Sequence, residues 1–426
     1  MKVLIVGGGG REHALAWKLR LDDPSVELIA APGNPGIAEL GRCEPIAATD
    51  IAGLLALAKR EKVGLTIVGP EGPLDAGIVD AFREAGLAVF GPTQAAARIE
   101  TSKAWAKALM VRAGVPTAAA RTFSDPTAAR AEARRLGAPV VIKATGLAAG
   151  KGVVVAQTLA DADDAIAMML EQHAFGEAGG EVLVEEFMTG EELSIFALTD
   201  GTHILPMMAA QDHKRIGEGD TGPNTGGMGA YLPVSIYTDS VMRDAVDRVF
   251  LPTLAAMRKE SAPFTGLLYA GLMLSPSGPK VVEFNCRFGD PETEAILPML
   301  ESSLLEPMHA IANGESLAGA APLKWRAGAA VTTVVAAAGY PGAVKGGDPI
   351  MIPPARNGLT VFHAGTKRDA SGRLVTAGGR VLAVTAVAAT LAEAQQASGA
   401  FAADVSFAGR QIRRDIGWRE LQRTRA

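Results

Sequence analysis

The chain has 426 residues, 48% hydrophobic and 20% charged, which is enough for about three domains with sizeable cores. The formal net charge of -5 comes from interspersed charges without a basic block, so we expect no nucleic-acid partner. Two distant cysteines, Cys43 and Cys286, exclude a disulfide framework. The sequence also has no apolar run long enough for a membrane span or a signal peptide. Together with the two cysteines, this leads us to expect a cytoplasmic protein without membrane contact.

The first hundred residues alternate strand and helix patterns. Short apolar runs predict strands at residues 3–6, 26–30, 65–68 and 89–90. Helical periodicity predicts helices at residues 11–19, 50–60 and 77–85. This alternation is typical of a parallel, doubly wound α/β domain.

A four-glycine turn at 7–10, followed by Arg11, separates the first strand from the first helix. Its amides at a helix N-terminus predict an anion site. The dinucleotide signature G-x-G-x-x-G is not met, because its last position falls on Glu12 or His13, and the second strand ends without an acidic residue for a ribose. We therefore favour plain phosphate binding or a structural turn over nicotinamide or flavin binding.

A glycine-rich hairpin is predicted between the strands 139–143 and 153–155. Lys143 ends the first strand, and the loop 144–152 contains three glycines and Lys151. A Walker loop requires G-x-x-x-x-G-K-[ST] leading into a helix, whereas a strand follows here, so this is not a P-loop. Such a hairpin can fold over a triphosphate, with its amides and lysines against phosphate oxygens. The alternative is an exposed flexible turn.

Two further segments carry mixed charge. The strand 182–187 runs into a break and then Glu192, which predicts a hinge for adenine with Glu192 near the ribose, or else a solvated acidic loop. The segment 211–229 is rich in glycine and charge, which predicts an active-site lip or a disordered loop. His213 lies in it without a serine or cysteine constellation, so we predict an anion contact rather than a general base.

The stretch 280–292 carries the clearest chemistry, and its strand is predicted to pair with 266–274 as a hairpin. Apolar and polar residues alternate along it, the first set being Val282, Phe284 and Cys286 and the second Glu283, Asn285 and Arg287. On a strand the polar set shares one face, with the apolar set buried behind it. Carboxylate and amide oxygens suit Mg²⁺, and the guanidinium suits an anion. A strand end with a surface ion pair is the alternative.

Five motifs in this order closely resemble those of the phosphoribosylamine-glycine ligase (GAR synthetase) family of ATP-grasp enzymes. They lie at 7–14, 146–152, 211–215, 222–228 and 283–292, and the run R-F-G-D-P-E-T at 287–293 is highly specific. The resemblance spans residues 1–418 and implies an α/β and α+β multidomain fold. It implies a Rossmann-like domain at 1–105, an ATP-grasp lid region at 106–192, an ATP-grasp central domain at 193–322 and a small α+β C-terminal domain at 323–426.

The resemblance also implies ligands. Glu283 and Asn285 would hold Mg²⁺ or Mn²⁺, with ATP as co-substrate. The ATP contacts it implies are Lys103, Lys143 and Lys151 on the phosphates, Gly146, Gly150 and Gly152 in the loop, Glu185, Glu186 and Met188 at the adenine hinge and Glu192 at the ribose. Two departures from the pattern are Thr145 at the loop entrance, where the family usually has aspartate, and a strand 269–273 without the metal carboxylate found in many ATP-grasp enzymes.

The implied reaction needs no protein nucleophile. Glycine's carboxylate attacks the γ-phosphate of ATP, and the amine of phosphoribosylamine displaces phosphate from glycyl phosphate, giving glycinamide ribonucleotide in de novo purine biosynthesis. The protein would neutralise charge and position substrates, with Arg287, Lys143 and Asp290 as the predicted catalytic residues.

Substrate contacts are predicted at Gly8, Gly9, Gly10, Arg11, Asp212, His213, Lys214, Arg215, Asn224 and Asp290, the last of these toward the ammonium group of glycine. We expect a monomer that acts on small molecules. The competing hypotheses are another ATP-grasp carboxylate-amine ligase and a nucleotide-binding protein or dinucleotide oxidoreductase without ligase activity.

Overall fold

The computed structural model describes residues 1–148 and 152–423, and it begins with a five-stranded parallel sheet in the order β3-β2-β1-β4-β5. The strands are β1 (Lys2–Gly7), β2 (Glu27–Pro32), β3 (Arg42–Cys43), β4 (Leu65–Val68) and β5 (Val89–Phe90). The helices are α1 (Gly10–Asp22), α2 (Ile51–Glu61), α3 (Glu71–Asp75) and α4 (Ile78–Glu84). The predicted doubly wound α/β architecture is confirmed, and its strand order reverses beside β1, where such folds form a crevice.

A four-stranded antiparallel sheet, β6-β9-β7-β8, carries the glycine-rich loop and is called the loop sheet. Its strands are β6 (Ala120–Phe123), β7 (Val140–Ala144), β8 (Val153–Ala156) and β9 (Val182–Glu186). The helices α7 (Pro126–Leu136) and α8 (Leu159–Ile166) bury alanines and an isoleucine against it. The predicted hairpin is confirmed, since β7 and β8 pair in register on either side of the loop.

A second antiparallel sheet, β11-β10-β16-β17, forms the centre of the molecule. It consists of β10 (Glu191–Thr199), β11 (Ile204–Pro206), β16 (Gly266–Ser275) and β17 (Gly278–Asn285), with the helices α5 (Gln94–Thr101), α6 (Lys103–Ala113), α9 (Asp239–Ala245) and α10 (Leu251–Lys259) nearby. The predicted hairpin of β16 and β17 is confirmed.

One side chain of β17 differs from the predicted alternation. Phe284 and Cys286 are buried, but Val282 is only half-buried. The register shifts here, because Gly271 pairs with Glu283 whereas Leu272 pairs with Val281, so Val282 is the extra residue of a β-bulge. The bulge turns Val282 toward the cavity described below.

A third antiparallel sheet, β12-β15-β18-β22-β19, joins the central and C-terminal parts of the chain. Its strands are β12 (Gln211–Asp212), β15 (Gly229–Leu232), β18 (Ala329–Ala336), β19 (Leu359–His363) and β22 (Arg380–Ala388). The other strands form the hairpins β13 (Arg215–Gly217) with β14 (Thr221–Asn224) and β20 (Thr366–Arg368) with β21 (Leu374–Thr376). The other α-helices are α11 (Glu292–Ile296), α12 (Leu305–Ala312), α13 (Leu391–Asp404) and α14 (Trp418–Arg423). This sheet crosses the boundary predicted at 322. The segment 211–229, predicted as an active-site lip or a disordered loop, contains the short strands β12, β13 and β14.

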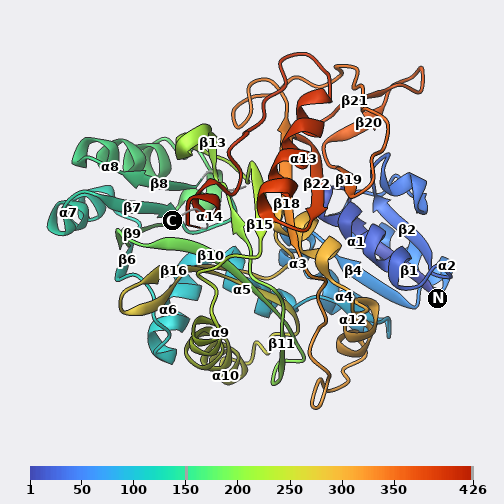
Figure 1. Cartoon of the computed structure of the whole chain (residues 1–426). Coiled ribbons are helices and arrows are strands. Elements are labelled where there is room, and N and C mark those ends of the chain that lie inside the picture. The colour runs from blue at the N-terminus through green and yellow to red at the C-terminus, as the bar shows by residue number, and fades with distance from the viewer. Residues whose placement is uncertain (149–151, 424–426) are drawn as a thin grey trace.

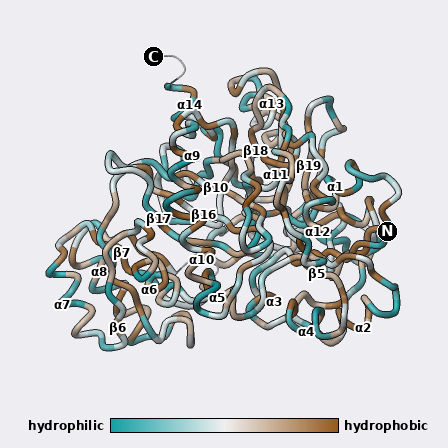
Figure 2. Tube along the Cα trace, turned by 90° about the horizontal axis from the view of Figure 1, so that it is seen from below, coloured by the Kyte–Doolittle hydropathy of each residue, from teal (hydrophilic) through white to brown (hydrophobic). Residues whose placement is uncertain are grey.

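Figure 1 shows the parallel sheet and the loop sheet on opposite sides of the molecule, with β10 and β16 between them and α13 with β22 along one edge. Hydrophobic residues gather on the inner strands in Figure 2, whereas the outlying helix α7 is largely hydrophilic. Among the residues that the structure describes, no helix is long and apolar enough to span a membrane.

Candidate active site

A cavity of about 310 Å³ lies where the loop sheet, the central sheet and the helices α5 and α6 meet. The structure brings many of the predicted site residues to its wall: Lys103, Lys143, Gly152, Glu185, Glu186, Met188, Glu192, Asp212, Lys214, Asn224, Glu283, Asn285, Arg287 and Asp290. Gly150 and Lys151 lie outside the described residues. Gly146 does not line the wall, but its carbonyl oxygen accepts a hydrogen bond from Lys103 Nζ at 3.2 Å.

One part of the cavity wall, called the apolar slot, consists of hydrophobic side chains. It includes Val141, Val155, Phe187, Met188, Met273 and Phe284. These side chains come from β7, β8, the end of β9, β16 and β17, so the slot lies between the loop sheet and the central sheet. Mainly apolar walls with a few convergent polar groups are typical of sites for small ligands.

Two of the cavity's lysines, Lys107 and Lys143, are held by the buried carboxylate of Glu185. Lys143 Nζ lies 2.8 Å from Glu185 Oε2 and donates to the carbonyl oxygen of Val282 at 3.1 Å, the group that the β-bulge exposes. Lys107 Nζ lies 3.1 Å from Glu185 Oε1. Burial by itself would raise the pKa of Glu185, but Lys143 and Lys107 outweigh it and hold that pKa below its usual value. Glu185 therefore stays ionised and anchors Lys143.

Lys107 was missed by the sequence analysis, although a signal for it exists. It lies four residues after Lys103 on α6, so the two side chains share one helix face. Lys107 also donates to Thr117 Oγ1 at 2.7 Å, and that hydroxyl donates to the carbonyl oxygen of Val281. Burial lowers the pKa of Lys103 despite the nearby carboxylate of Glu283.

Glu283 and Asn285 project from β17 into the cavity with two residues' spacing. Within the described parts of the chain, the side-chain amide of Asn285 has no hydrogen-bond partner, and the only ion pair of Glu283 is with Lys214 at 3.9 Å. Although burial would raise the pKa of Glu283, the surrounding lysines and Arg287 hold it below its usual value. A carboxylate oxygen and a free amide oxygen in a wall where acidic side chains outnumber basic ones fit a hard divalent cation.

Arg287 faces the cavity but is already paired with two carboxylates. Its Nη2 lies 2.9 Å from Glu100 Oε1, and its Nε donates to Glu71 Oε2 at 3.3 Å. Because its side chain is only 18% exposed, this is not the surface ion pair considered above. Burial opposes the charged form, but Glu100 and Glu71 raise the pKa of Arg287, so the guanidinium remains a fixed cation.

A second charge cluster surrounds Lys214, which follows β12. Lys214 Nζ lies 2.8 Å from Glu192 Oε2. Burial would lower its pKa, but Glu192, Asp212 and Glu283 raise it well above the usual value. The pKa of Asp212 is raised to about 8, mainly by burial. Lys214 lowers this pKa, but the neighbouring carboxylates add to the effect of burial. Glu292 Oε1 meanwhile accepts a hydrogen bond from Tyr269 Oη at 2.7 Å.

The four-glycine turn reaches the edge of this site without lining the cavity. The amide of Gly9 donates to Glu12 Oε2 at 2.6 Å, so the protein's own carboxylate takes part of the predicted anion site. Arg11 Nη1 donates to the carbonyl oxygen of Phe288 at 3.1 Å, while Asn34 Nδ2 donates to that of Gly8 at 2.9 Å. Gly10 begins α1.

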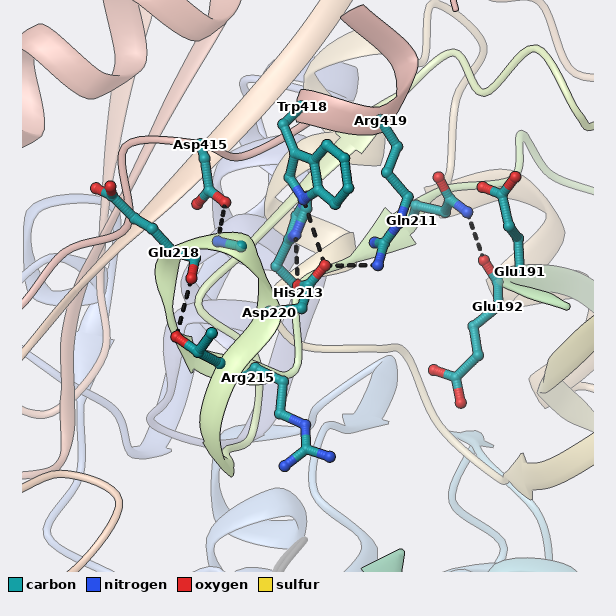
Figure 3. Close-up of polar contacts among 12 residues, drawn as sticks. Glu191, Glu192, Gln211, His213, Arg215, Glu218, Asp220, Asp415, Trp418 and Arg419 are labelled. Carbon is teal, nitrogen blue, oxygen red and sulfur yellow. Dashed lines mark hydrogen bonds and ion pairs between the residues drawn. The ribbon is translucent and has the colours of Figure 1, made fainter. Parts of the chain in front are cut away.

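Two residues with predicted substrate roles, His213 and Arg215, do not line the cavity. Figure 3 shows His213 beside Asp220 and Trp418. The ring of His213 accepts a hydrogen bond from the Gly417 amide at 2.8 Å and lies 3.4 Å from Asp220 Oδ1. Arg215 Nη1 donates to the carbonyl oxygen of Gly222. His213 lies between β12 and β13 and holds the C-terminal segment, whereas its neighbours Asp212 and Lys214 line the cavity.

Family models for three consecutive domains match the chain. Residues 1–100 match "Phosphoribosylglycinamide synthetase, N domain", residues 101–293 match the "ATP-grasp (A) domain" of the same enzyme, and residues 330–419 match its "C domain". Phosphoribosylamine-glycine ligases from Yersinia pestis and Escherichia coli (strain K12) are 50% and 49% identical to the chain over 429 residues, with at least 99% of each protein covered.

Solved structures agree with these relatives. Phosphoribosylamine-glycine ligase from Thermotoga maritima aligns with a TM-score of 0.85 and 32% identity, covering 98% of this chain and 100% of that one. A biotin carboxylase from Campylobacter jejuni, solved as a β-γ-ATP complex, aligns with a TM-score of 0.71 but only 16% identity. The alignment covers 96% of this chain and 92% of that one. That second likeness concerns the fold alone.

The fold and the cavity between the loop sheet and the central sheet define an ATP-grasp protein. Within that class, the full-length identity and the three matched domains are specific. The chain belongs to the phosphoribosylamine-glycine ligase family.

Proposed function

We propose that the chain is an ATP-dependent ligase that joins glycine to 5-phosphoribosylamine through glycyl phosphate, giving glycinamide ribonucleotide, ADP and phosphate for purine biosynthesis. The observation that carries this proposal is the convergence of Lys103, Lys143, Glu283, Asn285 and Arg287 on one cavity, in a chain that matches the family along nearly its whole length. No protein nucleophile is required, because the substrate carboxylate attacks the γ-phosphate itself.

ATP would lie with its adenine in the apolar slot beside Met188 and with its ribose toward Glu192. Lys103 and Lys143 would contact its phosphates, and Glu185 supports this role by holding the Lys143 ammonium group in one place. Glu186 would shape the hinge, since its carboxylate lies 3.6 Å from Lys280 Nζ and accepts a hydrogen bond from the Ala119 amide.

Glu283 and Asn285 would hold a divalent cation, Mg²⁺ or Mn²⁺. Such an ion, when bound, neutralises phosphate charge and orients the γ-phosphate. An acidic wall would otherwise repel a triphosphate, which supports the assignment. We expect chelation with EDTA to abolish product formation and added Mg²⁺ or Mn²⁺ to restore it, whereas full activity after exhaustive chelation would contradict a metal role.

Arg287 would stabilise the charge that develops on the transferred phosphoryl group. Its pairing with Glu71 and Glu100 fixes the guanidinium before substrates bind, as electrostatic preorganisation requires. Asp290 would hold the ammonium group of glycine, and Asp212, Lys214 and Asn224 would contact the substrates near the metal.

The decisive experiment measures ADP and phosphate release with and without each substrate, together with mass detection of the amide product. We expect release to require both glycine and phosphoribosylamine. Release stimulated by another amino acid and not by glycine would favour a different ATP-grasp carboxylate-amine ligase. Tight NAD(H) binding by calorimetry, without release, would favour an oxidoreductase.

We further propose that the enzyme acts as a cytoplasmic monomer without nucleic-acid or membrane partners. The two cysteines are both free, which supports a reducing compartment, and the net charge of -5 disfavours nucleic acid. Light scattering after gel filtration tests the monomer, and a mass of twice 43.9 kDa would contradict it.

A further inference from the structure

Glu294 is a buried carboxyl group that the proposed roles leave unused. It lies in α11, is 1% exposed and does not line the cavity. In the part of the chain that the structure describes, no donor forms a hydrogen bond with either of its carboxyl oxygens. An ionised carboxylate in such surroundings is strongly disfavoured, and the group takes up a proton instead.

The partner that a neutral Glu294 would need is Asp290. The two carboxyl groups lie within hydrogen-bonding reach of each other, one turn apart in the chain. Asp290 reaches the cavity wall, whereas Glu294 lies behind it. Two ionised carboxylates at this distance would repel each other, so a single proton between them is the stable arrangement.

The N-terminal turn of α1 closes the space behind this pair. A β-carbon at Gly10 would collide with Glu294 Oε1, and one at Gly9 would lie 3.7 Å from Asp290 Oδ2. Glycine at these positions therefore lets the backbone pack directly against both carboxyl groups. The backbone of Gly10 therefore bounds one side of the Glu294 carboxyl group.

The charged groups around the pair decide where the proton resides. Arg380 Nη1, from β22, lies 3.1 Å from Asp290 Oδ1 and also donates to the Asp290 carbonyl oxygen at 2.7 Å. Arg380, then Arg11 of α1 and Arg287, outweigh burial and lower the pKa of Asp290. Burial and the charge of Asp290 raise the pKa of Glu294 well above its usual value, although Arg380 opposes them. The proton therefore belongs to Glu294.

We propose that Glu294 is a positioning residue that remains a neutral acid at neutral pH and donates a hydrogen bond to Asp290, so that Asp290 faces the cavity as one fixed carboxylate for the ammonium group of glycine. Arg380 and Glu294 hold Asp290 from two directions, and each carboxylate oxygen keeps a further lone pair for the substrate. The identity of that ammonium group rests on the proposed function, whereas the protonation of Glu294 does not.

The test compares wild type with E294Q, whose amide donates a hydrogen bond at every pH. We expect kcat/KM for glycine to be similar in the two enzymes at neutral pH. Above the pKa of Glu294, wild type should fall about tenfold per pH unit relative to E294Q, because only its protonated form is competent. Using the ratio between variants cancels the pH effects on the substrates themselves. Identical pH profiles for the two enzymes would overturn the proposal.

Infrared difference spectroscopy tests the protonation without any substrate. We expect the difference between wild type and E294Q at neutral pH to contain the band of a protonated carboxyl group. E132Q is the matched control, because Glu132 is also buried but pairs with Arg135 at 2.7 Å, and its replacement should remove only a carboxylate band. A carboxylate band lost in E294Q would overturn the proposal.

A second variant separates a positioning role from packing. E294M has similar length and no donor, so its KM for glycine should rise about tenfold at every pH while its KM for ATP stays unchanged; an unchanged KM for glycine would also overturn the proposal. If wild type forms no amide from glycine, the proposed function fails, and the infrared band still decides the state of Glu294.

Discussion

Glu185 and Glu294 are both buried carboxyl groups at this site, 2% and 1% exposed, yet their environments differ completely. Glu185, beside the loop sheet, lies between the ammonium groups of Lys107 and Lys143 and is held ionised. Glu294, against the N-terminal domain, has Asp290 as its neighbour and is held neutral. Burial alone therefore does not set protonation, because the partner's charge decides whether the desolvation cost is offset.

Removing Lys143 should have the largest effect, because it would take both a phosphate contact from ATP and a counter-charge from Glu185. We expect Lys143→Met to lower kcat/KM for ATP by about 10³-fold, the upper range for one lost preorganised donor. Lys259, exposed at the end of α10, is the control position for the same substitution and should retain wild-type kinetics. A loss below tenfold would show that Lys143 only supports Glu185.

A third buried carboxyl group, Glu100, is paired with Arg287, which also pairs with Glu71. Arg287→Lys would test whether this arrangement of the guanidinium matters for catalysis. Lysine offers a point charge and cannot pair with both carboxylates in the same geometry. We expect kcat to fall by about 10²-fold, with nucleotide affinity changing far less, in steady-state kinetics and calorimetry.

Arg112→Lys is the matched control, since Arg112 forms an exposed pair with Glu260 and should tolerate the change. Unchanged kcat with weakened ATP binding in the Arg287 variant would mean that this guanidinium only holds the ground-state phosphate.

Asp290→Asn would remove the charged member of the Asp290–Glu294 pair. Glu294 would then have no charged carboxylate beside it, whereas Glu185 keeps its two charged lysines. We expect KM for glycine to rise about tenfold, because an amide cannot neutralise an ammonium group, while KM for ATP stays near wild type. Asp404→Asn, at an exposed pair with Arg356, serves as the control. Equal changes in the KM values for ATP and glycine would argue against a glycine contact.

Lys107→Met should have the smallest effect, because Lys143 remains beside Glu185. We expect KM for ATP to rise a few-fold and the free energy of unfolding to fall by about 2 kcal/mol, as for one lost hydrogen bond to a charged group. Lys107→Arg keeps the charge and should recover most of both losses.

The stability of this region should also depend on pH. The pKa of Glu185 is lower in the folded protein than in the unfolded chain, so its contribution is complete above the unfolded value and is lost as the pH falls through the folded value. In Lys107→Met the folded pKa rises, so the thermal midpoint should begin to fall at a higher pH than in wild type. Parallel curves for the two proteins would contradict the role of Lys107.

Local patterns in the sequence determined the parallel N-terminal sheet, the glycine-rich hairpin and the strand that carries Glu283 and Asn285. Each depends on apolar periodicity or turn residues within about ten positions, which the chain expresses without tertiary contacts. The family resemblance was likewise carried by short runs such as residues 287–293.

Only the tertiary structure decided which charged groups meet. Arg287 pairs with Glu71 and Glu100, which lie about two hundred positions earlier, and Asp290 pairs with Arg380 from β22. The bulge at Val282 and the position of His213 outside the cavity wall also depend on strand register and on distant partners. The protonation of a buried group depends on its burial and on neighbouring charges, and both arise from the packing of distant segments. No local sequence pattern around Glu294 therefore predicts that it is protonated.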